Sequence, residues 1–418
     1  MISKDLIKLL ITEYQREIPN IQLIERNYSV EKELNYVFVG LRRAGKSYLM
    51  FQQIQKLLNK GHSIDKILYF NFEDDRLANL ETGDLDLIKT CYEEMYDCKP
   101  VFFLDEIQII PNWEKFARRL ADQNFRVYIT GSNAKMLSSE IATTLGGRYI
   151  IKNVYPFSFK EFLIAIGIDT NEKKAFFHYR NEINKAFEIY FRFGGLPETM
   201  KVENKREWLS NLYQKVFFGD LISRYQIRND FAMRVLIRKL AESVRQPSSF
   251  SRLASIVSAS GKKITTDTVI DYLEYLKESW LIFSMENFAA KLADKESNKK
   301  HYFIDNGILN LFLIDPQTSL LENLVAIQLR KVYNDELYYY NCGSEVDFYL
   351  PEMQLAVQAC YSLNNIETYK REINGLLQLA CREDVKKMLI VTKDEERIIS
   401  EKNYEIEVIP IWKWLLLA

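Results

Sequence analysis

The N-terminal third of the chain alternates short apolar segments with longer segments of helical periodicity. Residues 45–59, for example, carry apolar side chains at the spacing of one helix face, and residues 1–34 are polar and look helical. Near-continuous apolar runs are typical of strands buried on both faces of a parallel sheet, so the alternation predicts an α/β fold. It stops near Ile151. Four predicted strands carry it: residues 35–40, 66–73, 100–106 and 125–133.

The rest of the chain follows other patterns. Residues 155–220 are mostly helical, residues 248–290 follow the order helix, turn, helix, strand, and the polar stretch 289–300 predicts a loop. Strands and helices mix again towards the C-terminus. We therefore predict four parts: an N-terminal α/β core at 1–154, a helical lid at 155–220, a winged helix-turn-helix module at 221–290 and a second α/β domain at 291–418.

Composition excludes several classes of function. The 418 residues are 47% apolar and 27% charged with a net charge of −1, which allows ordinary cores and excludes a polybasic tail. The five cysteines form no C-x-x-C pair and, with three histidines, give no metal-ligand cluster. No apolar run reaches the ~18 residues of a membrane span, and the stretch MISKDLIKLL does not have the pattern of a signal-peptide h-region and cleavage site. We expect a cytoplasmic protein with free thiols and no membrane partner.

The sequence GLRRAGKS, residues 40–47, is a phosphate-binding motif of the form G-x-x-x-x-G-K-S. It follows a predicted strand and opens a predicted helix, where backbone N–H groups surround nucleotide phosphates. Lys46 would supply a positive charge, and the Ser47 hydroxyl would ligate Mg²⁺. A glycine turn capped by a lysine is the plainer alternative, which these flanks disfavour. The predicted cofactors are ATP and Mg²⁺, and the predicted nucleotide-binding residues are Gly40, Arg43, Gly45, Lys46, Ser47 and Tyr48.

An acidic pair ends the third predicted strand. Asp105 and Glu106 follow the apolar run VFFL, and the carboxyl ends of parallel strands are where open sheets bind ligands. We predict that Asp105 holds Mg²⁺ through water and that Glu106 polarises the attacking water. A helix cap is the structural alternative.

Other candidates have weaker support from sequence. Ser132 and Asn133, at the end of the fourth strand, would lie beside the γ-phosphate and help to orient the water. Arg148 would stabilise transition-state charge across a subunit boundary, although a surface ion pair explains it nearly as well. Pro197, in the interrupting FGGLPE stretch, would lie against the adenine, or merely end a helix. Four charged residues at a strand end would couple nucleotide to a partner or lie in a solvated loop: Glu73, Asp74, Asp75 and Arg76.

Several of these motifs resemble a known family. GLRRAGKS, FLDEIQIIPNWEKFARRL, YITGSNAKMLSSEIATTLGGRY, YPFSFKEF and FGGLPE are similar to bacterial and archaeal AAA+-like P-loop ATPases of the additional-strand class. YFIDNGILN, LLENLVAIQL, SEVDFYL and VIPIWKWLL match the C-terminal region of that family. The resemblance implies nucleotide hydrolysis, and a C-terminal domain that resembles PD-(D/E)XK nucleases.

The nuclease pattern, carried over residue by residue, is incomplete. Glu322 and Asp347 occupy the helical and first strand acid positions. Gln358 stands where the second strand acid belongs, and Cys360 where the lysine belongs. A neutral amide is a weak Mg²⁺ ligand and a thiol is mostly neutral at pH 7. We therefore predict a nuclease-shaped domain without cleavage activity.

A basic stretch opens the predicted winged module. Residues 221–263 hold nine Lys or Arg and two acids, an excess that favours contact with phosphates. The would-be recognition helix, however, carries Asp267, Asp271, Glu274 and Glu278, which oppose direct base contact. A module that only reports nucleotide state is the alternative. The candidate nucleic-acid contacts are Arg224, Arg228, Arg238, Lys239, Arg245, Lys262 and Lys263.

These observations lead to one main functional hypothesis and two others. The first is a homo-oligomeric ATPase, a hexamer being one candidate, that binds or remodels DNA. The second is a nucleotide-dependent signalling or defence switch that acts on a protein partner without DNA. The third, an active nuclease, is disfavoured by Gln358 and Cys360.

Overall fold

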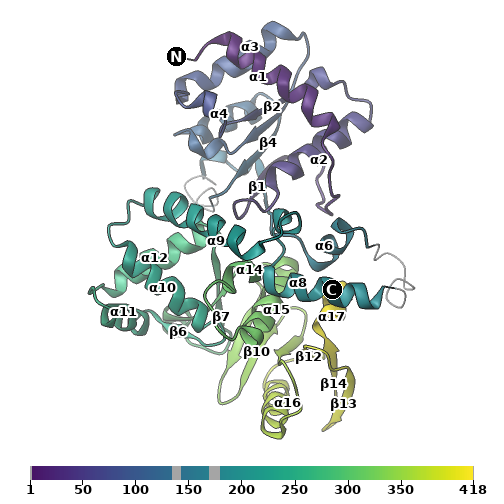
Figure 1. The fold of residues 1–418 in the computed structure, drawn as a ribbon, viewed down its shortest axis with the longest axis vertical. Coiled ribbons are helices and arrows are strands. Elements are labelled where there is room, and N and C mark those ends of the chain that lie inside the picture. Colours follow the sequence, from purple (N-terminus) through teal and green to yellow (C-terminus); the bar gives the residue numbers. More distant parts are fainter. Residues whose placement is uncertain (1, 134–142, 169–178, 418) are drawn as a thin grey trace. The chain divides into compact units, whose positions relative to one another are not determined.

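The computed structural model describes residues 2–133, 143–168 and 179–417. The chain folds as two compact units, Met1–Tyr155 and Pro156–Ala418. Figure 1 shows their helices and strands. Residues 134–142, which form part of the YITGSNAKMLSSEIATTLGGRY motif, lie outside the described ranges.

The smaller unit is built on one parallel sheet of five strands in the order β2-β3-β4-β1-β5. Strand β4 therefore lies between β1, which leads into the phosphate motif, and β3, which ends at Asp105, as the additional-strand resemblance implies. The strands are β1 (Asn35–Val39), β2 (Ile67–Asn71), β3 (Val101–Asp105), β4 (Arg126–Gly131) and β5 (Tyr149–Asn153).

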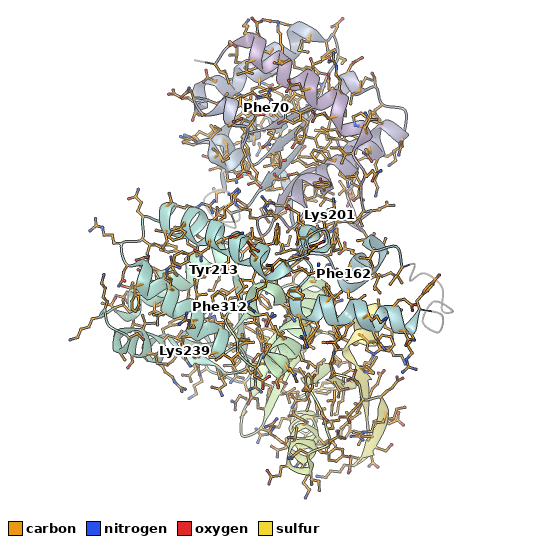
Figure 2. All side chains as sticks on the ribbon, in the orientation of Figure 1. Phe70, Phe162, Lys201, Tyr213, Lys239 and Phe312 are labelled. Atoms are coloured by element: carbon orange, nitrogen blue, oxygen red, sulfur yellow. The ribbon has the colours of Figure 1, made fainter. Side chains whose placement is uncertain are left out.

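Helices surround this sheet (Figure 1). They bury one apolar face each, and the strands are buried almost throughout, so Phe70 on β2 is fully inaccessible (Figure 2). The N-terminal helix packs against β2. The helices are α1 (Lys4–Glu17), α2 (Lys46–Asn59), α3 (Leu85–Met95) and α4 (Trp113–Asp122), with short 3₁₀ turns η1 (Ile18–Asn20), η2 (Ile64–Lys66), η3 (Asp75–Leu77), η4 (Thr82–Asp84) and η5 (Ile107–Ile109).

One local prediction for this unit was wrong, and one strand was not predicted. The N-terminal helical stretch ends at Asn20, and residues 21–33 contain neither helix nor strand. The strand pattern ends near Ile151 as predicted, but that residue lies in a fifth strand, β5, which pairs with β1 along its whole length. Strand β5 is only half-buried, so the continuous apolar run that marks the other strands is missing from its sequence.

The larger unit contains a mixed sheet of nine strands in the order β13-β14-β12-β11-β10-β9-β7-β8-β6. Strands β11, β12 and β14 run parallel, as do β7 and β9, and the other neighbours are antiparallel. The strands are β6 (Ser248–Ser249), β7 (Ile282–Asn287), β8 (Asn298–Phe303), β9 (Tyr338–Asn341), β10 (Glu345–Leu350), β11 (Leu355–Ala359), β12 (Lys387–Thr392), β13 (Arg397–Glu401) and β14 (Tyr404–Pro410).

Helices of the larger unit precede and flank this sheet, and α16 packs on β10 and β11 (Figure 1). Aromatic contacts join the segments: Tyr213 of α9 meets Phe312 edge-on, with ring centroids 5.1 Å apart (Figure 2). The helices are α6 (Phe159–Ala165), α8 (Arg180–Phe193), η7 (Pro197–Met200), α9 (Lys205–Lys215), the π-helix η8 (Val216–Ser223), α10 (Asp230–Glu242), α11 (Phe250–Ala259), α12 (Thr266–Glu278), α13 (Leu292–Ser297), α14 (Asn306–Leu309), α15 (Gln317–Tyr333), α16 (Ile366–Ala380) and α17 (Ile411–Leu417).

The stretch predicted as a polar loop, 289–300, is partly ordered into regular structure. It contains α13 and the first residues of β8, which pairs antiparallel with β7. The boundary predicted between residues 290 and 291 therefore falls between the two strands of one hairpin. Polar side chains concealed this strand from the sequence analysis, and one of them, Lys300, is buried.

Candidate functional site

The phosphate motif forms a loop between β1 and α2, and its glycines are required by backbone geometry. Gly45 has φ 94°, a conformation that favours glycine. A Cβ on Gly40 would lie 2.1 Å from the Val154 carbonyl oxygen, because the chain after β5 passes directly behind the loop. Buried Arg26 connects the loop to the chain after β5 by donating to the carbonyls of Ala44 (3.1 Å) and Tyr155 (2.9 Å).

The Lys46 ammonium is buried within this loop. It donates to the carbonyl oxygens of Gly40 (3.2 Å) and Leu41 (3.3 Å) and lies 3.2 Å from Glu106 Oε1. Lys46, which follows Gly45, and Glu106, which follows Asp105, therefore meet at the same edge of the sheet. This is the pairing expected when parallel strands present their carboxyl ends together.

Asp105 is buried and accepts several hydrogen bonds. Tyr69 donates to Oδ2 at 2.5 Å, and Thr130 donates to Oδ1 from the neighbouring strand β4. Burial and the adjacent Glu106 raise the pKa of Asp105, although its bonds from Thr130, Tyr69 and Ser47 oppose that shift. Ser47 and Asp105, the two predicted magnesium ligands, are thus hydrogen-bonded to each other.

Glu106 has its backbone in the left-handed region, with φ 55°. Its carboxylate accepts from the backbone N–H of Ser132 (3.1 Å) and from Gln108 (2.6 Å). Burial alone would raise the pKa of Glu106, but Lys46 and Gln108 outweigh burial and bring that pKa below its ordinary value. Glu106 is therefore ionised at neutral pH and held in one orientation, as a proton acceptor must be.

The donors at this edge fit a magnesium nucleotide. The loop offers glycine backbone at close approach and a buried ammonium, and Ser47 and Asp105 offer the two protein oxygens that a phosphate-bound Mg²⁺ commonly takes. The Ser132 hydroxyl oxygen is buried and has no hydrogen-bond partner among the described residues. An unpaired buried hydroxyl is costly, and a phosphate or water here would satisfy it.

The other predicted nucleotide-site residues have mixed positions. Asn133 is buried directly after β4, near Glu106 in the fold. Arg43 and Tyr48 are exposed, Arg43 with φ 64°. Pro197 opens η7 in the larger unit, and the preceding Gly195 is fixed there by Asp305, which accepts from the Gly195 N–H at 2.8 Å.

Arg148 lies at the opposite edge of the sheet from the phosphate loop. It immediately precedes β5, whose amino end pairs with the amino end of β1. Its guanidinium pairs with Asp122 and donates to the Gly146 carbonyl at 3.2 Å. The surface ion pair that the sequence left open as an alternative is therefore what this chain makes.

A second polar cluster lies in the larger unit, at the edge formed by β8, β10 and α15. Lys300 is fully buried, and its ammonium lies 3.4 Å from Glu322, 3.2 Å from Asp347 and 3.0 Å from Glu345. Tyr302 also donates to Glu322 at 2.9 Å. Burial alone would lower the pKa of Lys300, but Glu322, Tyr302 and Asp347 hold that pKa well above its ordinary value.

Lys300 was not among the residues predicted from sequence for this site. The lysine comes from β8, outside the third strand of the nuclease pattern, and sits between both predicted acids. The cluster borders a cavity of about 530 Å³ whose other lining residues include Arg245, Arg371 and Glu372. Burial and Asp347 raise the pKa of Glu322 to about 8.

Gln358 and Cys360 are engaged in other bonds. The Gln358 amide accepts from the Asp347 N–H at 2.9 Å and donates to the Glu345 carbonyl at 3.1 Å, so it ties β11 to β10. Cys360 donates to the Ser362 carbonyl, and burial raises the pKa of its thiol to about 12. Within the described ranges, no three His, Cys, Asp or Glu side chains are arranged to hold a metal ion.

The basic candidates lie on α10 and in the segments before α10, after α10 and between α11 and α12. Arg224 pairs with Asp220 (2.9 Å) and Lys239, on α10 (Figure 2), lies 3.9 Å from Glu242. Helix α12 exposes Asp267, Asp271 and Glu274. The remaining candidates are exposed: Arg228, Arg238, Arg245, Lys262 and Lys263.

Together, the sheet order, the phosphate loop after β1 and the acid pair after β3 define a P-loop domain of the AAA type. Residues 32–163 match a family described as an AAA domain, and residues 184–318 match a domain of unknown function, DUF8612. Uncharacterized protein MJ1544 of Methanocaldococcus jannaschii is 35% identical over 399 residues, which cover 91% of this chain and 88% of that protein. The chain belongs to the family of that protein.

Two further proteins are similar to this chain. An uncharacterized protein of Haemophilus influenzae is 29% identical over 392 residues, 91% of this chain and 94% of its own. The solved Walker-type ATPase PABY2304 of Pyrococcus abyssi covers 75% of this chain and 96% of its own at 13% identity, with a TM-score of 0.40. The family assignment rests on the sequence matches.

Across the parts of the chain that the structure describes, every helix is too short or too polar to traverse a lipid bilayer.

Proposed function

We propose that this protein is an ATPase that converts ATP and water to ADP and phosphate. The observation that carries the proposal is the convergence of Lys46, Ser47, Asp105 and Glu106 at one sheet edge, with Glu106 ionised and oriented by Ser132 and Gln108. Sequence proximity explains only half of this group, since Asp105 and Glu106 come from a different strand.

Each side chain has a defined task in this proposal. Lys46 leaves Glu106 and binds the phosphates, which frees the Glu106 carboxylate to accept a proton from water. Ser47 and Asp105 would hold a magnesium ion, Asp105 through water, and the ion would neutralise phosphate charge. Ser132 and Asn133 orient the water, and the buried, unpaired Ser132 hydroxyl supports that role. Arg43, Tyr48 and Pro197 remain predictions for the nucleotide site.

Nucleotide binding and phosphate release by wild type, Lys46→Ala and Glu106→Gln test the proposal. Lys46→Ala should lose ATP binding, whereas Glu106→Gln should bind ATP and not hydrolyse it. Normal phosphate release by Glu106→Gln would remove Glu106 from its role, and wild type that binds no nucleotide would refute the proposal as a whole.

For the larger unit, we propose a nuclease-like domain that does not cleave. The order α15, β9, β10, β11, α16, β12 matches the helix–strand succession of that resemblance. Lys300 occupies the space between Glu322 and Asp347 without any access to solvent, and Gln358 supplies no carboxylate. Magnesium-dependent cleavage of DNA that disappears in Asp347→Ala would overturn this proposal.

We further propose that a homo-oligomer of the protein acts on DNA, with α11, α12 and the β7–β8 hairpin as a winged module. The exposed Arg228, Arg238, Lys262 and Lys263 support backbone contact, while the acidic outer face of α12 argues against base recognition. A nucleotide-dependent switch on a protein partner is the second candidate, and that acidic face favours it. ATPase rates with duplex, forked and single-stranded DNA, at several salt concentrations, separate the two: unchanged rates and no salt-sensitive binding would exclude the DNA-linked function.

A further inference from the structure

Arg42 lies inside the phosphate loop, four residues before Lys46, and was not among the residues predicted from sequence. The loop backbone around it is strongly curved, with Arg43 and Gly45 both at positive φ. A side chain at this point of the loop begins beside the space that nucleotide phosphates occupy. The Arg42 side chain is only 17% exposed, so most of it is covered by protein.

The Arg42 guanidinium is bound to an acid at the same sheet edge as Asp105. Its Nη1 lies 2.7 Å from Glu73 Oε1. Glu73 follows β2, and its N–H donates at 3.0 Å to the side chain of Asn71, the residue that pairs with Asp105 in the sheet register. The Glu73–Arg42 pair is therefore attached to the strand next to the catalytic acids.

Arg42 and Lys46 belong to the same phosphate loop, residues 40–47. Two cations thus face the same region and each is paired with a carboxylate of the chain: Lys46 with Glu106, and Arg42 with Glu73.

Phosphate oxygens compete for both cations. A guanidinium presents a planar fork of N–H donors that matches phosphate oxygens, and such charge-assisted hydrogen bonds are stronger than neutral ones. We propose that Arg42 binds the terminal phosphate of ATP in its own subunit, and that Glu73 withholds the guanidinium until ATP is bound. The inference rests on the proposed ATP binding and names one more residue of that site.

With this assignment, each chain has its own phosphate-binding arginine and needs no neighbouring subunit to supply one. Arg148, the arginine assigned from sequence, lies at the amino edge of the sheet and is paired with Asp122. An effect of Arg42 should therefore be independent of protein concentration, whereas an arginine supplied across a subunit boundary requires assembly.

Equilibrium binding of fluorescently labelled ATP and ADP tests the inference without relying on turnover. Arg42→Ala should weaken ATP binding about tenfold or more and ADP binding much less, since a charge-assisted bond is worth roughly 10- to 100-fold in affinity. Glu73→Gln should bind ATP at least as tightly as wild type, because it removes the competing carboxylate. Arg76→Ala is the matched control: its guanidinium pairs with Asp74 and Glu13, and its nucleotide affinities should match those of wild type.

Several results would overturn the inference. Equal weakening of ATP and ADP in Arg42→Ala would mean that Arg42 only shapes the loop. Glu73→Gln that weakens ATP binding as Arg42→Ala does would mean that Glu73 positions the arginine rather than withholding it. If Arg42→Ala does not fold, Arg42→Gln, which keeps a similar length, replaces it. If the wild-type protein binds ATP and these variants behave like Arg76→Ala, this inference alone is refuted. If the wild-type protein binds no nucleotide, the ATPase proposal is refuted with it.

Discussion

Replacing Lys300 with methionine should destabilise the larger unit by about 3 kcal/mol at pH 7. The side chain is fully buried, and its ammonium contacts Glu322, Asp347 and Glu345 at 3.4, 3.2 and 3.0 Å. Methionine keeps an unbranched apolar stem but removes the charge. The carboxylates then remain inside the protein without their cation, and breaking a buried ion pair in this way costs about 3–5 kcal/mol.

The exposure and protonation of the three acids place the expected loss at the lower end of that range. The Glu345 side chain is 47% exposed and keeps its hydration. Glu322, with a pKa of about 8 caused by burial and Asp347, is largely protonated at pH 7. Asp347, with a side chain only 14% exposed, is therefore the main charge left without a partner.

Urea unfolding of the full-length chain, followed by tryptophan fluorescence, measures the loss. The signal reports mainly on the larger unit, because only Trp113 lies in the smaller one and the other tryptophans are Trp208, Trp280, Trp412 and Trp414. Lys299→Met is the matched control from the neighbouring position of β8. Lys299 pairs with Glu286 and Glu296, whose side chains are 35% and 66% exposed, so its loss should cost at most about 1 kcal/mol.

The double variant Lys300→Met/Asp347→Asn completes the experiment. Because it also removes the main unpaired charge, it should recover much of the stability lost in Lys300→Met. A Lys300→Met protein as stable as Lys299→Met would refute the buried-cation argument. So would a double variant that recovers nothing, since the loss would then come from packing rather than charge.

Four further predictions follow from particular residues. Glu106→Gln should retain ATP affinity and lose phosphate release, because an amide cannot accept the proton; both are measured on one preparation, and retained hydrolysis would contradict the role. Glu322→Gln should flatten the pH dependence of thermal unfolding. The pKa of Glu322 rises from 4.5 to about 8 on folding, so its contribution to stability is full below pH 4.5 and is lost as pH rises through about 8. An unchanged slope in the variant would show that Glu322 is not the source of this pH dependence. Gly195→Ala should lower the unfolding temperature, since its Cβ would lie 2.1 Å from the Phe157 carbonyl oxygen, and wild-type stability would show that the loop adjusts. If the Arg148 guanidinium acts across a subunit boundary, Arg148→Ala should slow turnover only at concentrations where sedimentation shows assembly; equal loss in the dilute monomer would exclude that role.

The smaller unit could be predicted from sequence because its signals are local. Residues 40–47 form one continuous loop, and the run VFFLDE delivers its two acids at a strand end whatever the rest of the chain does. Buried parallel strands are also recognisable in the sequence as continuous apolar runs. Strand β5 escaped prediction because its half-buried side chains alternate too weakly to form such a run.

Only the tertiary structure decided which side chains meet at each site. Lys300 is 22 residues from Glu322 and 47 from Asp347 along the chain, and it lies in a polar stretch that looks like a loop. Strand pairing with β7 buries it and carries its ammonium to the two acids. Arg42 and Glu73 are likewise 31 residues apart, and they meet because β1 and β2, the strands that they follow, belong to the same sheet. Local sequence fixes a motif and its backbone, whereas pairing between distant strands sets the charges that surround it.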